Sequence, residues 1–111
     1  MNEDLSDVKS VNDRLNEIQL VDCRELYEWD AGRVEGAIHV PLNTLMSGSG
    51  PALDPDKPVA VICRSGNRSE LATHMLRARG FEAYNLERGL EEWAQEGHPL
   101  STPDGQPGHV A

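Results

Sequence analysis

Hydrophobic residues along the chain form short runs with two different periodicities. Continuous apolar runs predict strands that are buried on both faces, and alternating runs predict strands with one buried face. On this basis we expect strands at 18–23, 36–42, 59–62 and 81–86. Apolar residues at helical spacing, each group closed by a glycine, predict helices at 25–32, 69–80 and 89–97.

Three segments lack such a clear pattern. Residues 46–58 are rich in Gly, Ser, Pro and Asp, which predicts a surface loop with room for one short turn of helix. Near the N-terminus, DVKSV is compatible with a short strand and NDRL with the start of a helix. Residues 98–111 hold three prolines and two glycines with few core-forming residues, so we expect 101–111 to be a disordered tail.

Strand and helix patterns alternate at short spacing, which favours right-handed crossovers and a parallel sheet. The predicted fold class is therefore α/β, with a central, mostly parallel sheet flanked by helices on both faces. With 111 residues the chain is long enough for one compact domain, which we place at 1–100. Functional sites of such folds lie at the carboxyl ends of the strands, and Cys63 directly follows the strand at 59–62.

The acidic balance of the chain excludes several classes of partner. The formal net charge is −9, which would repel nucleic acid phosphates and anionic membranes, and we expect neither as a partner. No apolar run is long enough to span a bilayer, and the acidic start MNEDLSDV does not resemble a secretory signal, so we expect a cytoplasmic protein. Within 63–80, however, four arginines are accompanied by one acidic residue, Glu70, which favours a small anion there.

Cysteine and histidine usage gives no indication of a metal site. The two cysteines, Cys23 and Cys63, lie forty positions apart, and no CxxC motif occurs. The four histidines show no ligand spacing. We therefore expect neither a metal nor a disulfide framework.

The stretch CRSGNRS, between a buried strand and a helix, has the residues of a reactive thiol site. Backbone N–H groups at the start of a helix bind anions, and neighbouring guanidinium groups lower the pKa of a thiol, so a thiolate nucleophile is expected. Glycine permits a tight loop, and a serine hydroxyl can cap the helix. The candidate site consists of Cys63 as nucleophile and six substrate-binding residues, Arg64, Ser65, Gly66, Asn67, Arg68 and Ser69. The alternative is that Cys63 is a small buried core residue.

Three blocks in order resemble the single-domain form of the rhodanese-like sulfurtransferase family. They are LVDCRELYEWDAGRVEGAIHVPL, VAVICRSGNRS and GFEAYNLERGLEEWAQEGHPL, and together they span about 8–100. The resemblance implies that the Cys63 thiolate takes sulfur from a donor such as thiosulfate, keeps it as a persulfide, and passes it to cyanide or a thiol. It implies no metal and no organic cofactor.

Two alternative functions stay open. A phosphatase or arsenate reductase of the same fold would use a cysteine with an arginine cradle, but its loop has five residues between cysteine and arginine. Here four residues separate Cys63 from Arg68, and Ser69 occupies the position of that arginine. The other alternative is a binding or relay module that exchanges sulfur with a protein donor or acceptor.

Other unusual residues have simpler expected roles. We expect Asp22 and Arg24 to pair within the structure, because buried charges are normally compensated. Trp29 and Trp93 are expected to anchor their helices in the core. Arg33 stands where the family often has a histidine, and we expect it to change a local turn contact. Cys23 is expected to be a core residue, with the further hypothesis that it approaches Cys63 and acts as a resolving thiol.

Overall fold

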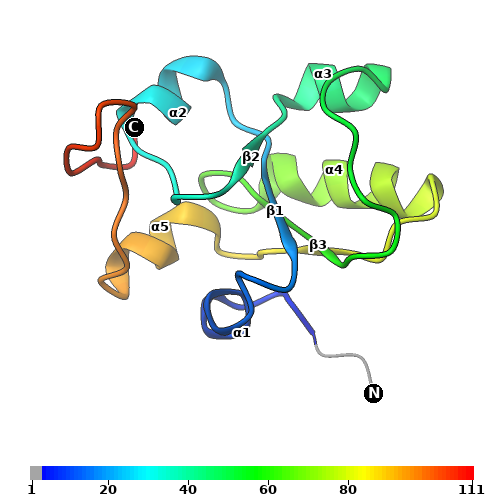
Figure 1. The fold of residues 1–111 in the computed structure, drawn as a ribbon, viewed down its shortest axis with the longest axis horizontal. Coiled ribbons are helices and arrows are strands. Elements are labelled where there is room, and N and C mark those ends of the chain that lie inside the picture. The colour runs from blue at the N-terminus through cyan, green and yellow to red at the C-terminus, as the bar shows by residue number, and fades with distance from the viewer. Residues whose placement is uncertain (1–3) are drawn as a thin grey trace.

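Four parallel strands form the centre of the fold in the computed structural model, which describes residues 4–111 (Figure 1). The elements in chain order are α1 (Val8–Asp13), β1 (Gln19–Asp22), α2 (Leu26–Ala31), β2 (Ile38–His39), α3 (Leu42–Ser47), β3 (Val59–Ile62), α4 (Asn67–Ala78), β4 (Ala83–Asn85) and α5 (Gly89–Gln95). The strand order is β2-β1-β3-β4, and each neighbouring pair is parallel. The predicted α/β class is confirmed. Residues 1–3 of the predicted domain lie outside the described residues.

Helices cover both faces of this sheet, as predicted. Because side chains of a strand alternate between faces, β1 and β3 contribute to two separate apolar clusters. One cluster joins the sheet to α1 and α5 through Val8, Val11, Leu20, Ala60, Ile62, Leu90 and Trp93. The other joins it to α3 and α4 through Val21, Leu45, Val59, Val61, Ala72 and Leu76. Burial of both faces explains why the sequence of β3 is continuously apolar.

The N-terminal segment is helical where a strand had been considered. Asp7 caps α1, because its side chain accepts a hydrogen bond from the amide of Ser10 at 2.8 Å. Val8 and Val11, three positions apart, are both buried on the core side of this helix. The spacing of the two valines therefore fits a helix better than the strand compatible with DVKSV.

Two helix boundaries also differ from the sequence prediction. The helix expected inside 46–58 is α3, which begins at Leu42 and ends at Ser47, ahead of most of that loop. Helix α4 begins at Asn67, two residues before the predicted start, because Gly66 and not Ser69 is its N-cap. The early start brings the first turn of α4 close to the end of β3.

Segment 101–111 differs from the expected disordered tail. Ser101 forms antiparallel bridges with Arg33 and with Pro107, and the amide of His109 donates to the carbonyl of Ala31 at 3.0 Å. In Figure 1 this red segment lies beside α2. Gly32 has no side chain to obstruct the approach, and a Cβ there would collide with the backbone of His109. Gly108, one of the glycines that suggested disorder, instead permits this close packing, because a Cβ there would collide with the backbone of Gly32.

Two further features of residues 4–111 limit the range of sites. No helix in this range is both long enough and apolar enough to cross a bilayer. The same residues include no group of three or more His, Cys, Asp or Glu side chains that could hold a metal ion.

Candidate functional site

Cys63 lies directly after β3, at the carboxyl edge of the sheet, and its side chain is buried. Its Sγ accepts hydrogen bonds from two backbone amides, that of Gly66 at 3.2 Å and that of Ser69 at 3.4 Å. The hydroxyl of Ser69 lies 3.3 Å from the same sulfur. In the part of the chain that the structure describes, Gly66 and Ser69 are the residues of loop 64–69 whose backbone amides donate to the Cys63 sulfur.

This environment favours the ionised form of Cys63. A hydrogen bond with the Cys23 thiol is the largest cause that lowers the pKa of Cys63, and the hydroxyl and amide of Ser69 and the amide of Gly66 lower it further. Burial acts in the opposite direction, yet the pKa falls from 9.0 to about 4. Cys63 is therefore a thiolate at neutral pH, the form in which sulfur is nucleophilic.

The carbonyl groups of Cys63 and Arg64 bond away from the sulfur, to the start of α5. The Cys63 carbonyl accepts from the amide of Leu90 at 2.8 Å, and the Arg64 carbonyl accepts from the amide of Glu91 at 3.0 Å. Both donors belong to the first turn of α5, whose amides have no partner within the helix. Gly89, the first residue of α5, makes this approach possible, since a Cβ there would overlap the same two carbonyls.

Gly66 allows the turn between the sulfur and α4. Its φ of 99° lies in the left-handed region, as predicted for this position. A Cβ on Gly66 would overlap the carbonyl oxygen of Glu87. Glycine is therefore required at position 66 for two reasons, the left-handed backbone angle and the close approach of the chain after β4.

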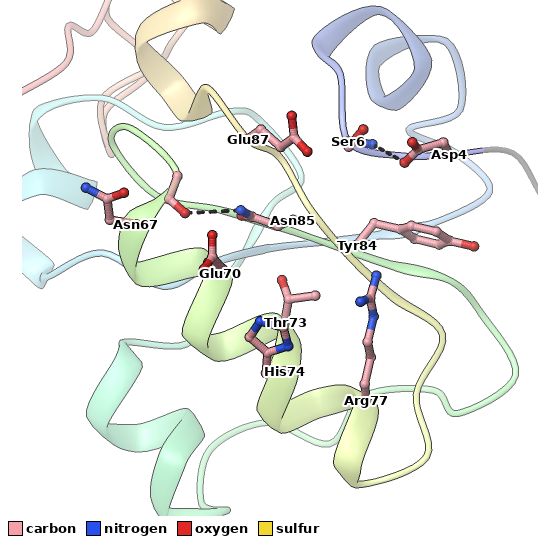
Figure 2. Close-up of a pocket in the computed structure, with 11 residues that line it drawn as sticks. Asp4, Ser6, Asn67, Glu70, Thr73, His74, Arg77, Tyr84, Asn85 and Glu87 are labelled. Carbon is pink, nitrogen blue, oxygen red and sulfur yellow. Dashed lines mark hydrogen bonds between the residues drawn. The ribbon is translucent and has the colours of Figure 1, made fainter.

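Asn85, at the end of β4, holds the loop from its other side. Its Nδ2 donates to the carbonyl of Gly66 at 3.1 Å, as Figure 2 shows. Its Oδ1 accepts from the Ser69 hydroxyl at 2.5 Å. The single proton of that hydroxyl therefore has two acceptors within reach, Asn85 and the Cys63 sulfur.

A cavity of about 560 Å³ opens beside this contact, between α4, β4 and the N-terminal segment that carries Asp4 and Ser6 (Figure 2). Its lining includes Asn67, Glu70, His74 and Arg77 but not Cys63. The cavity therefore borders the loop without reaching the sulfur.

Arg68 is bound to Glu28 of α2. Its Nη1 and Nη2 donate to the two carboxylate oxygens of Glu28 at 2.7 and 2.8 Å, and Glu28 is nearly fully buried. This bidentate contact lowers the pKa of Glu28. The guanidinium that the sequence suggested for anion binding thus ties the loop to α2, while its charge still interacts with that of Cys63.

The remaining loop residues lie toward the surface. The Nε of Arg64 donates to Glu91 at 3.3 Å, and the Arg64 side chain is about half exposed. Ser65 and Asn67 are exposed. Ser69, expected to cap the helix, lies inside α4 and directs its hydroxyl to Asn85 and the sulfur instead.

Arg24 and Asp22 form the buried ion pair expected from the sequence. The Nη2 of Arg24 lies 2.8 Å from Oδ2 of Asp22, and both side chains are fully buried. Arg24 also donates to the carbonyls of Glu28 and Gly32. Arg24 thereby fixes the middle and the C-terminal end of α2 relative to β1.

The two tryptophans differ in burial. Trp93 is buried in the core, as expected. Trp29 is half-buried, and its ring stacks on His39 with centroids 4.6 Å apart. The guanidinium of Arg33 lies 4.7 Å from the centroid of the same ring, so the arginine at the family's histidine position packs on Trp29.

The sequence prediction gave no role in the site to three residues that shape it, namely Glu28, Asn85 and Gly89. Glu28 lies three positions after Glu25, and the two form a capping box that a sequence can reveal. Asn85 was detectable as a polar residue near the end of an otherwise strand-like segment. Gly89 was assigned only to its helix, because the residues around it do not show that the loop after Cys63 approaches it closely in the fold.

The structure is an α/β fold in which a buried thiolate lies between a central parallel strand and a helix. A site of this kind depends on its cysteine. Comparison with known proteins shows to which family the chain belongs. The Rhodanese-like domain family matches residues 7–96, and the chain belongs to this family.

Named relatives connect this domain with sulfur chemistry. YrkF of Bacillus subtilis, whose name describes a sulfur carrier protein, is 29% identical over 77 residues, 68% of this chain and 41% of YrkF. MoeZ of Mycobacterium tuberculosis, whose name describes an adenylyltransferase/sulfurtransferase, is 33% identical over 84 residues, 74% of this chain and 21% of MoeZ. The chain thus spans less than half the length of either relative. Both relatives are thus named for the handling of sulfur.

Solved structures agree with the fold. A rhodanese-related protein from Thermoplasma volcanium has a TM-score of 0.80 at 28% identity, covering 89% of this chain and 97% of that one. A rhodanese-like domain protein from Staphylococcus aureus has a TM-score of 0.75 at 26% identity, covering 86% and 94%.

Proposed function

We propose that the chain is a sulfurtransferase in which Cys63 carries one sulfane sulfur as a persulfide. The observation that supports this most is the convergence of the Gly66 and Ser69 amides on a buried Cys63 sulfur whose pKa is strongly lowered. Fixed donors of this kind stabilise negative charge on sulfur without reorganisation during the reaction.

The proposed reaction has two displacements. The Cys63 thiolate attacks the outer sulfur of a donor such as thiosulfate, the sulfur–sulfur bond of the donor breaks, and sulfite leaves with the electron pair. Cyanide or a thiol then attacks the outer sulfur of the persulfide, and Cys63 leaves as the thiolate. Negative charge remains on sulfur throughout, so the inward amides can serve both steps. The proposal includes no metal or organic cofactor, and the cytoplasm remains the predicted location.

A second candidate is a sulfur relay that a protein partner loads. Arg68 is committed by a bidentate contact to the buried carboxylate of Glu28, so its guanidinium is not free to hold the sulfite end of thiosulfate. The name of YrkF as a sulfur carrier adds to this interpretation. A phosphatase is disfavoured as well, because Ser69 stands at the position of the phosphatase arginine and the adjacent Arg68 is paired with Glu28.

Intact-protein mass spectrometry tests the proposal. Reduced protein is incubated with thiosulfate or with glutathione persulfide, and Cys63→Ser is the control. We expect a gain of one sulfur atom on Cys63 and formation of thiocyanate when cyanide is added. Fast loading by the persulfide with slow loading by thiosulfate would favour the relay. No gain of sulfur from either donor would refute sulfur transfer by Cys63.

A further inference from the structure

Cys23 and Cys63 occupy equivalent positions at the ends of two paired strands. The register of β1 and β3 places Asp22 opposite Ile62, and the amide of Cys23 donates to the carbonyl of Ile62 at 3.0 Å. The next pair of positions beyond this register is Cys23 and Cys63. Neighbouring strands lie about 4.8 Å apart, which falls within the range of about 4.4–6.8 Å between the Cα atoms of disulfide-bonded cysteines.

The two thiols also lie on the same face of the sheet. Val21, Cys23, Val61 and Cys63 all belong to the apolar cluster between the sheet and α3 and α4. Cys23 is 0% exposed and Cys63 is 1% exposed, and neither forms a disulfide in this structure. The hydrogen bond between the thiols raises the pKa of Cys23, so Cys23 keeps its proton beside the Cys63 thiolate.

We propose that Cys23 is a resolving thiol that discharges the Cys63 persulfide when no acceptor arrives. This inference rests on the proposed function, because it requires a sulfane sulfur on Cys63. It assigns a reaction to a residue that otherwise lies in the core and supports the ionised form of Cys63.

The reaction needs no external oxidant. The outer sulfur of the Cys63 persulfide anion first takes the proton of Cys23, which leaves Cys23 as a thiolate. This thiolate attacks Sγ of Cys63, and the Cys23–Cys63 bond forms as the bond from Sγ to the outer sulfur breaks. The outer sulfur leaves with the electron pair of that bond and departs as hydrosulfide. The sulfane sulfur is reduced to sulfide while the two cysteines are oxidised to a disulfide.

Burial determines which reactions compete for the stored sulfur. Cys23 is internal and always adjacent, whereas an acceptor must reach the loop from solvent. Transfer therefore succeeds when an acceptor is present, and otherwise the sulfur is released and the site is closed as a disulfide. A dithiol reductant would restore both thiols by thiol–disulfide exchange.

The test compares wild type with Cys23→Val, which preserves an apolar side chain in the cluster, and with Cys23→Ser, which is close to cysteine in size. Each protein is loaded with glutathione persulfide, separated from the donor without oxygen, and incubated without acceptor. In the wild type we expect one equivalent of hydrosulfide, a final mass two hydrogen atoms below the reduced protein, and a link between tryptic fragments 15–24 and 34–64. In both variants the persulfide should persist at least about tenfold longer.

Three other results would overturn the inference. Equal persulfide lifetimes in wild type and variants would show that Cys23 takes no part. Release of hydrosulfide without a link between the two fragments would assign the release to another route. If no protein gains sulfur at the loading step, the proposed function fails first and the inference fails with it.

Discussion

The carboxylate of Glu28 accepts two hydrogen bonds from the guanidinium of Arg68, and this ion pair joins α2 to the first turn of α4. The contact connects the segment after β1 with the loop after β3. It therefore fixes the position of the loop around Cys63 as well as stabilising the fold.

Removing Arg68 should cost much more stability than removing Arg64. Arg68→Ala leaves the buried Glu28 carboxylate without its partner, and we expect the free energy of unfolding to fall by about 2–3 kcal/mol. Arg64→Ala is the matched control, because its ion pair with Glu91 is exposed and should contribute less than about 1 kcal/mol. Urea denaturation measures both, and equal losses would contradict the role assigned to the Glu28–Arg68 pair.

The same pair predicts a dependence of stability on acid pH. The pKa of Glu28 is lower in the folded protein than its ordinary value of 4.5, so the unfolded chain binds the proton more readily. The stabilisation is therefore complete above pH 4.5 and is lost as the pH falls through the lowered value. We expect the difference in free energy of unfolding between wild type and Glu28→Gln to be constant from about pH 7 to pH 5 and to shrink below that range.

Urea denaturation at several pH values measures this difference. The ionisation of Cys63 occurs in both proteins and cancels in the comparison. A difference that stays constant into the acid range would show that Glu28 contributes through shape and not through charge.

Gly66 should tolerate substitution less well than another glycine with the same backbone angle. Gly66→Ala forces a residue with Cβ into a left-handed angle and also against the Glu87 carbonyl. Gly80→Ala meets only the first cost, about 1–2 kcal/mol, because nothing lies within 4 Å of a Cβ at Gly80. We expect Gly66→Ala to lower the thermal midpoint by clearly more than Gly80→Ala, and equal shifts would show that the loop can move away from Glu87.

The hydroxyl of Ser69 should contribute to the ionisation of Cys63. Ser69→Ala keeps the backbone amide and removes the hydroxyl, so we expect the pKa of Cys63 to rise and sulfur uptake to slow about tenfold. Ser65→Ala is the control, because Ser65 is exposed and its hydroxyl does not contact the sulfur. Titration of the ultraviolet thiolate absorbance measures the pKa, and an unchanged value in Ser69→Ala would leave the backbone amides and Cys23 as the main donors.

The parts of the fold predicted from sequence are those set by local patterns. The run VAVI indicated a strand buried on both faces, and glycine in CRSGNRS indicated a left-handed turn, because each depends on the residues themselves. The fold class followed from the alternation of such segments. The N-terminal segment was ambiguous in the sequence, and the cap by Asp7 and the burial of Val8 and Val11 decide in favour of a helix.

The contacts of the site were less predictable because they join distant segments. Arg68 appeared available for an anion, and its partner Glu28 lies forty positions earlier in the chain. Asn85 and Gly89 act on the loop only after β4 and α5 are in place. The proximity of Cys23 to Cys63 is the one contact between distant segments that the sequence indicated. Parallel strands that end at the same edge of a sheet bring together the residues that follow them.

The strand order has a consequence for how the chain folds during synthesis. All strand pairs of the described sheet are parallel, so no pair can form as a local hairpin. The inner strand β1 leaves the ribosome before both of its neighbours, and its apolar residues remain unpaired until β2 and β3 follow. We expect slow nucleation and a need for protection of the nascent chain, since non-local strand pairing delays folding and exposes strand edges to aggregation.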